Sequence, residues 1–194
     1  MNPHWLWAAF TLTAAASQTL RNAVQHDLVQ HIGAANATFV RFLFGFPFSL
    51  VFLALACASA GAPPLAPDAA ALGYLVFASA AQVLATALML LAMRENSFVV
   101  ATALTKTEAV QIVAFGLLFL GDAATPALLL AVTLATFGVF VLSFPTVAIF
   151  ARRDARSNWR AAGYGLASAA AFGLSTVAFR AGILALGGGS FVLA

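Results

Sequence analysis

The chain has 194 residues, of which 63% are hydrophobic and 8% are charged. Globular domains carry roughly 25% charged residues, so this composition excludes a soluble domain built around one core and predicts an integral membrane protein. The formal net charge of +3 is spread over the connections without the basic runs that bind nucleic acid, so we expect no nucleic-acid partner.

Six apolar stretches are long enough to cross a lipid bilayer as helices. A hydrocarbon core of about 30 Å needs about 20 helical residues, and the alternation typical of barrel strands is absent. We therefore predict an all-α, polytopic membrane protein, and the expected spans cover residues 5–24, 35–58, 69–93, 97–120, 126–150 and 160–186.

The connections between these spans are short. We expect residues 25–34 to form a polar loop, in which His26 and His31 have a spacing that suits no metal site. Gly121 is expected to end the fourth helix, and Thr125 is expected to cap the fifth.

Weak internal similarity divides the chain into two parts. The segment AAAFGLSTVAFR from residue 169 is similar to AAASQTLRNAVQ from residue 14, and GGGSFV is similar to AANATFV. We expect a first five-helix repeat over residues 1–150, a linker over 151–160, and over 161–194 the start of a second, truncated repeat that includes the beginning of a seventh helix.

Polar residues form stripes on the first and third expected helices. Gln18 and Asn22 lie one turn apart on the first, and Gln82 and Thr86 lie one turn apart on the third. Hydrogen bonding between packed helices explains most such residues. For Gln18 and Gln82, helix packing and a role in a cavity are equally good interpretations.

The fourth expected helix carries two charges near its middle, Lys106 and Glu108. An ionised side chain at the bilayer centre costs at least about 2.5 to 3.5 kcal/mol, so such residues face protein or an aqueous cavity. Because Lys106 and Glu108 are two residues apart on one helix, their side chains should point to nearly opposite sides, and we expect them to contact different helices. Glu108 shares its face with Gln111, and its candidate partners are Arg41 and Arg180.

Two interpretations of these charges stay open. One is a structural ion pair that fixes helix register. The other makes Glu108 a protonatable coupling site and Lys106 an anchor for a substrate carboxylate.

Small residues recur on the sixth expected helix, at Gly165, Ala169, Gly173 and Thr176. Such a stripe allows a neighbouring helix to approach closely, and helix packing is its default explanation.

Enzyme motifs are missing: the sequence contains no HExxH, GxSxG, CxxC, GxGxxG or P-loop pattern. We therefore predict that the protein is not an enzyme and needs no cofactor or metal. An intramembrane enzyme would require histidines beside Glu108.

Several short motifs occur in order along the chain: Arg21, FVRFLFG at 39–45, ALMLLAMRENSFVVATALTKTEAV at 87–110, and LFLGD at 118–122. In these motifs the chain resembles the drug/metabolite transporter superfamily, specifically its ten-helix exporters with EamA-type repeats. The resemblance implies two inverted five-helix repeats and alternating access around a central cavity lined chiefly by the first, third, fourth and sixth helices. Family members commonly carry a proline about where Glu108 or Ala109 stands, so TKTE departs from the pattern.

We predict a secondary transporter in a bacterial inner membrane that exports small metabolites such as amino acids, with proton or cation coupling as a further hypothesis. The alternative is a non-transporting scaffold or assembly subunit. The candidate residues for substrate contact are Gln18, Gln82, Lys106 and Gln111, and those for coupling are Glu108 and Arg41. Membrane orientation stays open, because the Arg-rich connections place the amino terminus outside whereas the resemblance implies that both ends are cytoplasmic.

Overall fold

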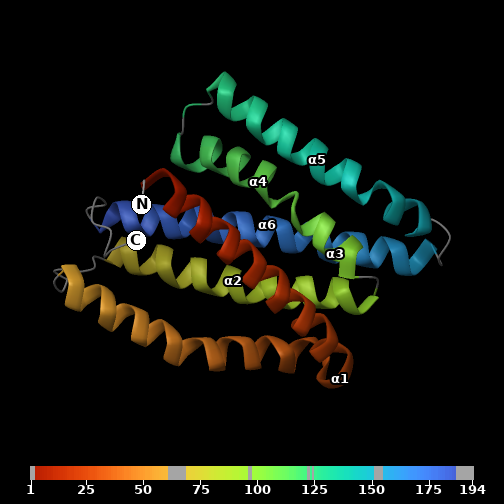
Figure 1. The fold of residues 1–194 in the computed structure, drawn as a ribbon, viewed down its shortest axis with the longest axis horizontal. Coiled ribbons are helices and arrows are strands. Elements are labelled where there is room, and N and C mark those ends of the chain that lie inside the picture. The colour runs from red at the N-terminus through yellow and green to blue at the C-terminus, as the bar shows by residue number, and fades with distance from the viewer. Residues whose placement is uncertain are drawn as a thin grey trace.

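A computed structural model describes residues 3–60, 69–95, 98–121, 123, 125–150 and 155–186 of the chain. The elements are α1 (Pro3–Ala60), α2 (Ala69–Glu95), α3 (Phe98–Thr105), α4 (Glu108–Phe115), the short π-helix η1 (Gly116–Leu120), α5 (Pro126–Phe150) and α6 (Ala155–Ala185) (Figure 1). The predicted all-α class is confirmed, and within these ranges four stretches are long and apolar enough to cross a membrane: Ala8–Ala58, Ala69–Glu95, Ala101–Leu120 and Trp159–Ala185.

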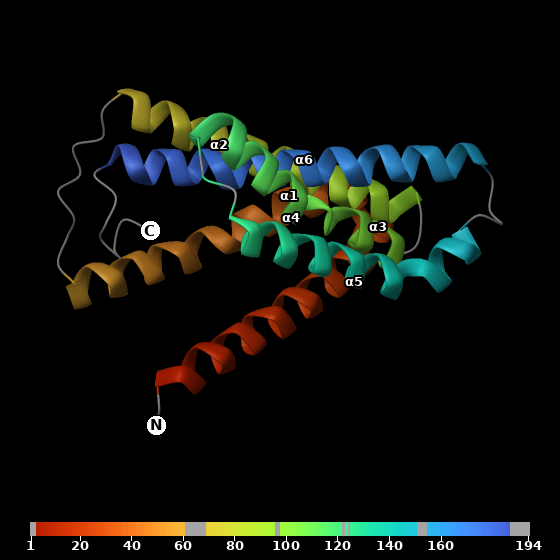
Figure 2. The same cartoon turned by 90° about the horizontal axis from the view of Figure 1, so that it is seen from above.

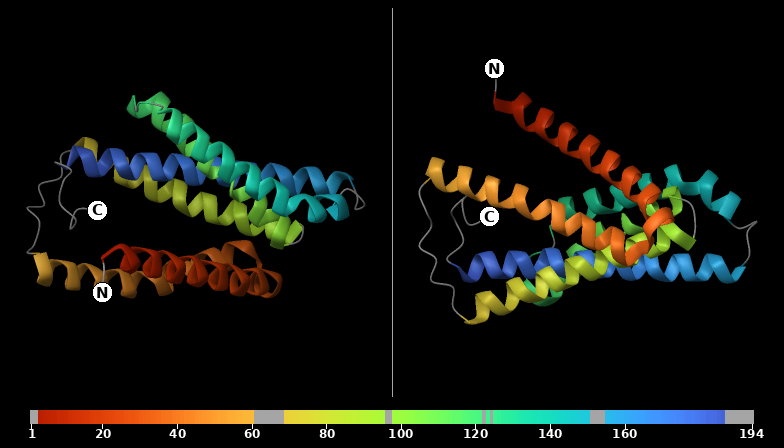
Figure 3. Two further views of the ribbon diagram at one scale, coloured as in Figure 1. Left: turned by 45° about the horizontal axis from the view of Figure 1, so that its top comes forward. Right: turned by 90° about the horizontal axis from the view of Figure 1, so that it is seen from below.

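The long element α1 is a pair of helices that meet at Gly33. This residue has φ 79° and ψ 165°, a conformation that is essentially restricted to glycine. The chain reverses there, so that the first part of α1 crosses in front of the bundle and the second part runs back from the corner, diverging from α2 along its length (Figures 1 and 3). Each part is long enough to span a bilayer, in agreement with two separate spans in this region.

Residues 25–32 were expected to form a loop, and this expectation is wrong, because the helix continues to the turn at Gly33. The segment is amphipathic, with Gln25 and Val29 buried one helical turn apart. His31 lies on this helix, and its Nδ1 is 2.9 Å from the carbonyl oxygen of Asp27. Burial of the apolar side of this segment favours the helix over a loop.

The helices α2 and α6, which share the most extensive contact in the described part of the chain, are joined by small residues in heptad register. Four fully buried alanines of α2 recur every seven residues and face an equally spaced row of small residues on α6. The row on α2 is Ala71, Ala78, Ala85 and Ala92, and the row on α6 is Ala161, Ser168, Ser175 and Gly182. Ser168 donates a hydrogen bond to the carbonyl of Ala85, and Ser175 donates one to that of Ala78, both at 2.8 Å. The two helices therefore pack antiparallel at short separation.

A second row of small residues on α6 faces α3 and α4. A Cβ added to Gly165 would lie 2.8 Å from Leu104 Cβ, and one added to Gly173 would lie 3.3 Å from the Phe115 ring. The close approach predicted from the stripe of small residues on this helix is therefore confirmed at these two glycines. As a result, α6 is held between α2 on one side and the α3–α4 segment on the other.

This geometry makes a prediction about stability. Gly165→Ala should lower the free energy of unfolding by about 1 kcal/mol, because overpacking against Leu104 exceeds the gain in helix propensity. Gly163→Ala is the matched control on the same helix, since a Cβ there meets nothing within 4 Å. Reversible unfolding in mixed detergent micelles measures both, and an equal response of the two variants would contradict the prediction.

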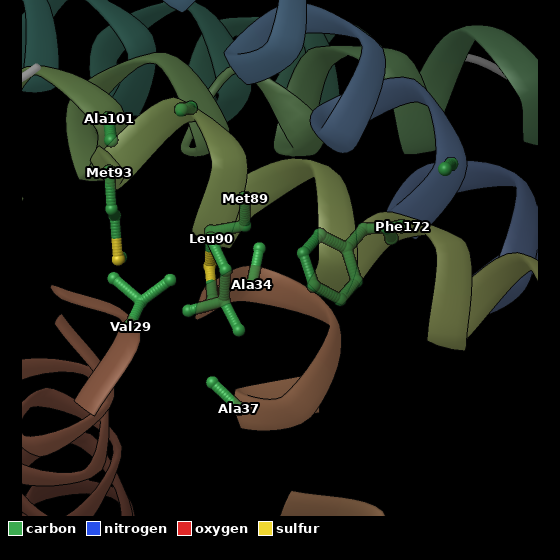
Figure 4. Packing of buried hydrophobic residues seen from close by; sticks show 11 residues of the cluster. Val29, Ala34, Ala37, Met89, Leu90, Met93, Ala101 and Phe172 are labelled. Carbon is green, nitrogen blue, oxygen red and sulfur yellow. The ribbon is translucent and has the colours of Figure 1, made fainter. Parts of the chain in front are cut away.

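The α1 turn is attached to α2 by a small hydrophobic cluster. Val29 and Ala37, from either side of Gly33, lie with Met89, Leu90 and Met93 of α2, which are at most 4% exposed (Figure 4). The amino-terminal part of α1 extends away from this cluster (Figure 2), and large side chains on it such as Phe10 remain 71% exposed. The corner at Gly33 is therefore the part of α1 that is anchored to the bundle.

Local signals at the start of α5 are confirmed. Gly121 has φ 66° after η1, as expected for a glycine that ends a helix. Thr125 Oγ1 accepts a hydrogen bond from the amide of Leu128 at 3.2 Å, which is the expected N-cap.

The helix α6 begins at Ala155, inside the segment predicted as a linker, while residues 151–154 and 187–194 lie outside the described part of the chain. The division into repeats stays a prediction.

Candidate functional site: a polar cavity beside a helix break

The fourth expected helix, over residues 97–120, is not continuous. It is divided into α3 and α4 by a turn at Lys106 and Thr107. Across this turn the amide of Thr107 donates to Leu104 and that of Ala109 donates to Lys106, which are three-residue steps in place of the four-residue steps of an α-helix. The break therefore falls within the TKTE segment itself.

Threonine side chains bond to the backbone carbonyls at this turn. The hydroxyl of Thr107 donates to the carbonyl of Leu104 at 2.7 Å, and that of Thr105 donates to the carbonyl of Ala101 at 2.8 Å. Hydroxyl bonds of this kind compete with the backbone ladder and bend helices. Because the Thr107 hydroxyl donates to Leu104, it does not cap α4. The carboxylate of Glu108, in the first turn of α4, suits the positive amino-terminal end of the helix dipole.

A cavity of about 210 Å³ opens beside the break, bounded by both parts of α1, by α2, α3, α4 and α6. Ten of its twelve lining side chains are polar or charged. They are the cations Arg21, Arg41 and Lys106, the carboxylate Glu108, the amides Gln18, Asn22 and Gln82, and the hydroxyls Thr102, Thr105 and Thr176, joined by the apolar Met89 and Phe172. Such a concentration of polar groups between membrane-spanning helices is the default candidate for a functional site.

The expectation that Lys106 and Glu108 point to opposite sides is wrong, because both line this same cavity. The prediction assumed a constant rotation of about 100° per residue along one helix. The turn at Lys106 and Thr107 interrupts that rotation. The break thus brings two charges of opposite sign to one site.

Arg41 reaches the cavity through the reversal at Gly33. Its Nη1 donates to Gln25 Oε1 at 3.3 Å, and its guanidinium carbon lies 5.7 Å from the centroid of the Phe42 ring. Gln25 and Arg41 stand eight residues before and eight after Gly33, so the hairpin places them opposite each other. In the described part of the chain no ion pair within 4.0 Å joins Arg41 to Glu108, although both line the cavity.

Two polar groups in the cavity wall lack a partner. The side-chain oxygen of Asn22 and the hydroxyl of Thr102 are buried without a hydrogen bond, and Asn22 as a whole is only 8% exposed. Gln82, by contrast, is held by Ser175, whose single hydroxyl hydrogen is shared between Gln82 Oε1 at 2.9 Å and the carbonyl oxygen of Ala78 at 2.8 Å. Buried polar groups without a partner are costly, so Asn22 and Thr102 suit a polar ligand or water.

Among the sequence-predicted residues, Gln111 is not in the cavity lining. Its Nε2 donates to Thr107 Oγ1 at 3.4 Å. Its Cβ packs against Gly173 of α6, where an added Cβ atom would lie 3.5 Å away. Gln111 therefore lies between the helix break and α6. The other five predicted residues, Gln18, Gln82, Lys106, Glu108 and Arg41, all line the one cavity, while Arg180 lines a different pocket beside Ile112 and Gly116.

Sequence reasoning did not select several of the lining residues. Arg21 and Asn22 stand three and four residues after Gln18, so the same helical stripe contained a signal for them. Thr102 and Lys106 are likewise four residues apart on one face. Phe172 and Thr176 of α6 gave no comparable signal, because an apolar or hydroxyl side chain in a membrane helix is ordinary.

In the described residues, no group of three or more His, Cys, Asp or Glu side chains could hold a metal ion. The cavity instead combines charge, amide and hydroxyl groups, which bind small polar molecules by electrostatic attraction and hydrogen bonding.

The helices and the cavity together define a multi-pass membrane protein with an internal polar site. Residues 5–144 match the model of the EamA-like transporter family. The match covers most of the chain, and the protein belongs to this family of membrane transporters for small molecules. No curated protein and no solved structure matches the chain.

Proposed function

We propose that the protein is a secondary transporter of the bacterial inner membrane that exports small metabolites such as amino acids, and that the cavity beside the helix break is its substrate site. The observation that carries this proposal is the meeting of ten polar or charged side chains in a cavity of about 210 Å³ inside a membrane protein of a transporter family. A scaffold has no need for such a site, since each buried charge is costly.

In this proposal Gln18, Gln82 and Lys106 contact the substrate directly. Gln82 is already oriented by Ser175, and Lys106 presents an ammonium group that suits a substrate carboxylate. Gln111 supports the turn through its bond to Thr107 and acts as a positioning residue. Broken membrane helices are a common way in which transporters expose polar groups to a substrate near the bilayer midplane.

Glu108 and Arg41 are the proposed coupling residues. Glu108 is the one carboxylate in the described lining of the cavity, and it can exchange a proton as the site alternates between the two sides of the membrane. Arg41, now bonded to Gln25, lies at the same cavity and is available to exchange partners when the helices rearrange. The movement itself is proposed to be alternating access, in which one group of helices rocks against another.

Flux of radiolabelled amino acids through proteoliposomes under an imposed pH gradient tests the proposal. Wild-type protein should move label that empty liposomes retain. Gln18→Trp should abolish that flux, because the indole fills the cavity from the exposed part of α1. Thr19→Trp is the matched control, since Thr19 is exposed and its hydroxyl bonds only to Ala15 of its own helix.

The two outcomes separate a transporter from a scaffold. Flux in Thr19→Trp with none in Gln18→Trp supports a substrate path through the cavity. Absence of flux from the wild type, or equal flux in both variants, would count against it.

A further inference from the structure

The charge of the cavity points to a class of substrate. We propose that the site selects anionic compounds that carry more carboxylate than ammonium groups, such as small dicarboxylates. This inference rests on the proposed function, because it takes the cavity to be the substrate site, and it goes further by naming the chemistry of what binds there.

Positive charge exceeds negative charge in the lining. Arg21, Arg41 and Lys106 face a single carboxylate, that of Glu108. Arg41 is half-buried, whereas Arg21 and Lys106 are exposed, and in the described residues none of the three forms an ion pair with a carboxylate within 4.0 Å. A low dielectric strengthens the Coulomb attraction for an anion most at the half-buried Arg41. Even if Glu108 compensates one cation, two positive side chains remain for the substrate to neutralise.

The two unpartnered groups add hydrogen bonds that a carboxylate can use. The Thr102 hydroxyl is buried in the cavity wall without a partner, and it can donate to a carboxylate oxygen once a shift of the wall exposes it. Asn22 is more than nine-tenths buried, and a flip of its amide would present the NH₂ group in the place of its unpartnered oxygen. These groups lie in the same lining as the three cations, so charge and hydrogen bonding favour the same type of ligand.

The volume limits the size of that ligand. A cavity of 210 Å³ corresponds to about seven water molecules at about 30 Å³ each, and it is smaller than the pockets of about 300 Å³ or more that hold drug-sized compounds. A four- or five-carbon metabolite is the appropriate scale. Met89 and Phe172 offer an apolar surface for its short carbon chain.

Other charge classes fit less well. A cationic substrate would find one carboxylate and three like charges. A simple zwitterion could place its ammonium at Glu108 and its carboxylate at one cation, but two cations would then stay unneutralised. A second carboxylate in place of the ammonium group removes that deficit, because Glu108 and the two substrate carboxylates then balance the three cations. A compound with net negative charge is therefore preferred.

The test uses three four-carbon probes that differ in charge and are similar in length: succinate, succinamide and 1,4-diaminobutane. Binding to the purified protein in phosphatidylcholine nanodiscs is measured by titration calorimetry and by the shift in Tm. Succinate should bind, and the neutral and cationic probes should bind at least about tenfold more weakly. Equal or tighter binding of either of those probes, or no binding of succinate, would overturn the inference.

Amino-acid substitutions show which side chains are responsible for succinate binding. Arg41→Gln and Lys106→Gln should each weaken succinate binding by about tenfold or more, whereas Glu108→Gln should strengthen it, because it removes the one negative charge of the described lining. The matched control is Arg160→Gln, an exposed arginine of α6 outside the cavity lining. An equal loss in Arg160→Gln would show a general surface effect and contradict the assignment. The Tm of each variant without ligand shows that it is folded.

Failure of the inference and failure of the proposed function give different results. Transport of diaminobutane that Gln18→Trp blocks would refute anion selection and leave a transporter. Binding of succinate with the expected charge dependence, but no flux of any labelled compound under any gradient, would refute transport and leave the anion site.

Discussion

Transport by the Glu108→Gln variant is expected to lose its dependence on a pH gradient. The amide has nearly the shape of the carboxyl group, so the cavity keeps its form, but it cannot take up or release a proton. Glu108 is the one acidic side chain in the described lining, so the described residues contain no acidic substitute at this site. Flux driven by an imposed pH gradient should therefore fall to the level measured without a gradient.

The control for this experiment is Asp27→Asn, which removes an exposed carboxylate of α1 outside the cavity. It should keep the response to the gradient. Exchange of labelled substrate at equal concentration on both sides measures binding and conformational change without a driving force, and Glu108→Gln should retain that exchange. Gradient-driven flux that is unchanged in Glu108→Gln would remove Glu108 from the coupling mechanism.

Gly33→Val is expected to have the largest effect on folding. The backbone at Gly33, with φ 79° and ψ 165°, excludes a β-branched side chain, and forcing one there costs about 1 to 3 kcal/mol or straightens the turn. Because the turn places Arg41 beside Gln25, its loss also removes a cation from the cavity. We expect a lower free energy of unfolding and strongly reduced transport in the fraction that remains folded.

Gly45→Val is the matched change within the second part of α1. A Cβ at Gly45 meets nothing within 4 Å, and the residue lies in regular helix, so stability should stay within about 0.5 kcal/mol or rise. Unfolding in mixed micelles measures stability, and proteoliposome flux measures function. Similar effects of the two valines would show that the conformation of Gly33 is not the cause.

Apolar periodicity and local breaker residues predicted much of the fold. Signals within a few residues of each boundary predicted the spans that form α2 and α5, the glycine at 121 and the cap at Thr125. The same reasoning failed at residues 25–32, where several polar residues suggested a loop. There the burial of Gln25 and Val29 against distant parts of the chain stabilises a helix that local composition alone disfavours.

The site was predicted as a set of residues but not as a geometry. Charged and amide side chains in apolar helices are costly enough to stand out in a sequence, which is why Gln18, Gln82, Arg41, Lys106 and Glu108 could be selected. Their arrangement depended on the turn at Lys106 and Thr107, for which the sequence offers only a run of threonines and no proline or glycine. The bond between Arg41 and Gln25 depended on a hairpin whose turn was not located in advance.

The helix break also links the charge of this site to its backbone. Thr107 has φ −64° and ψ −11°, which lies in the α region. The residue before a proline is pushed out of this region towards extended backbone, so a proline at position 108 would disturb the turn as well as delete the carboxylate. The acid and the shape of the break are therefore coupled, because glutamine at this position changes the charge alone whereas proline changes both.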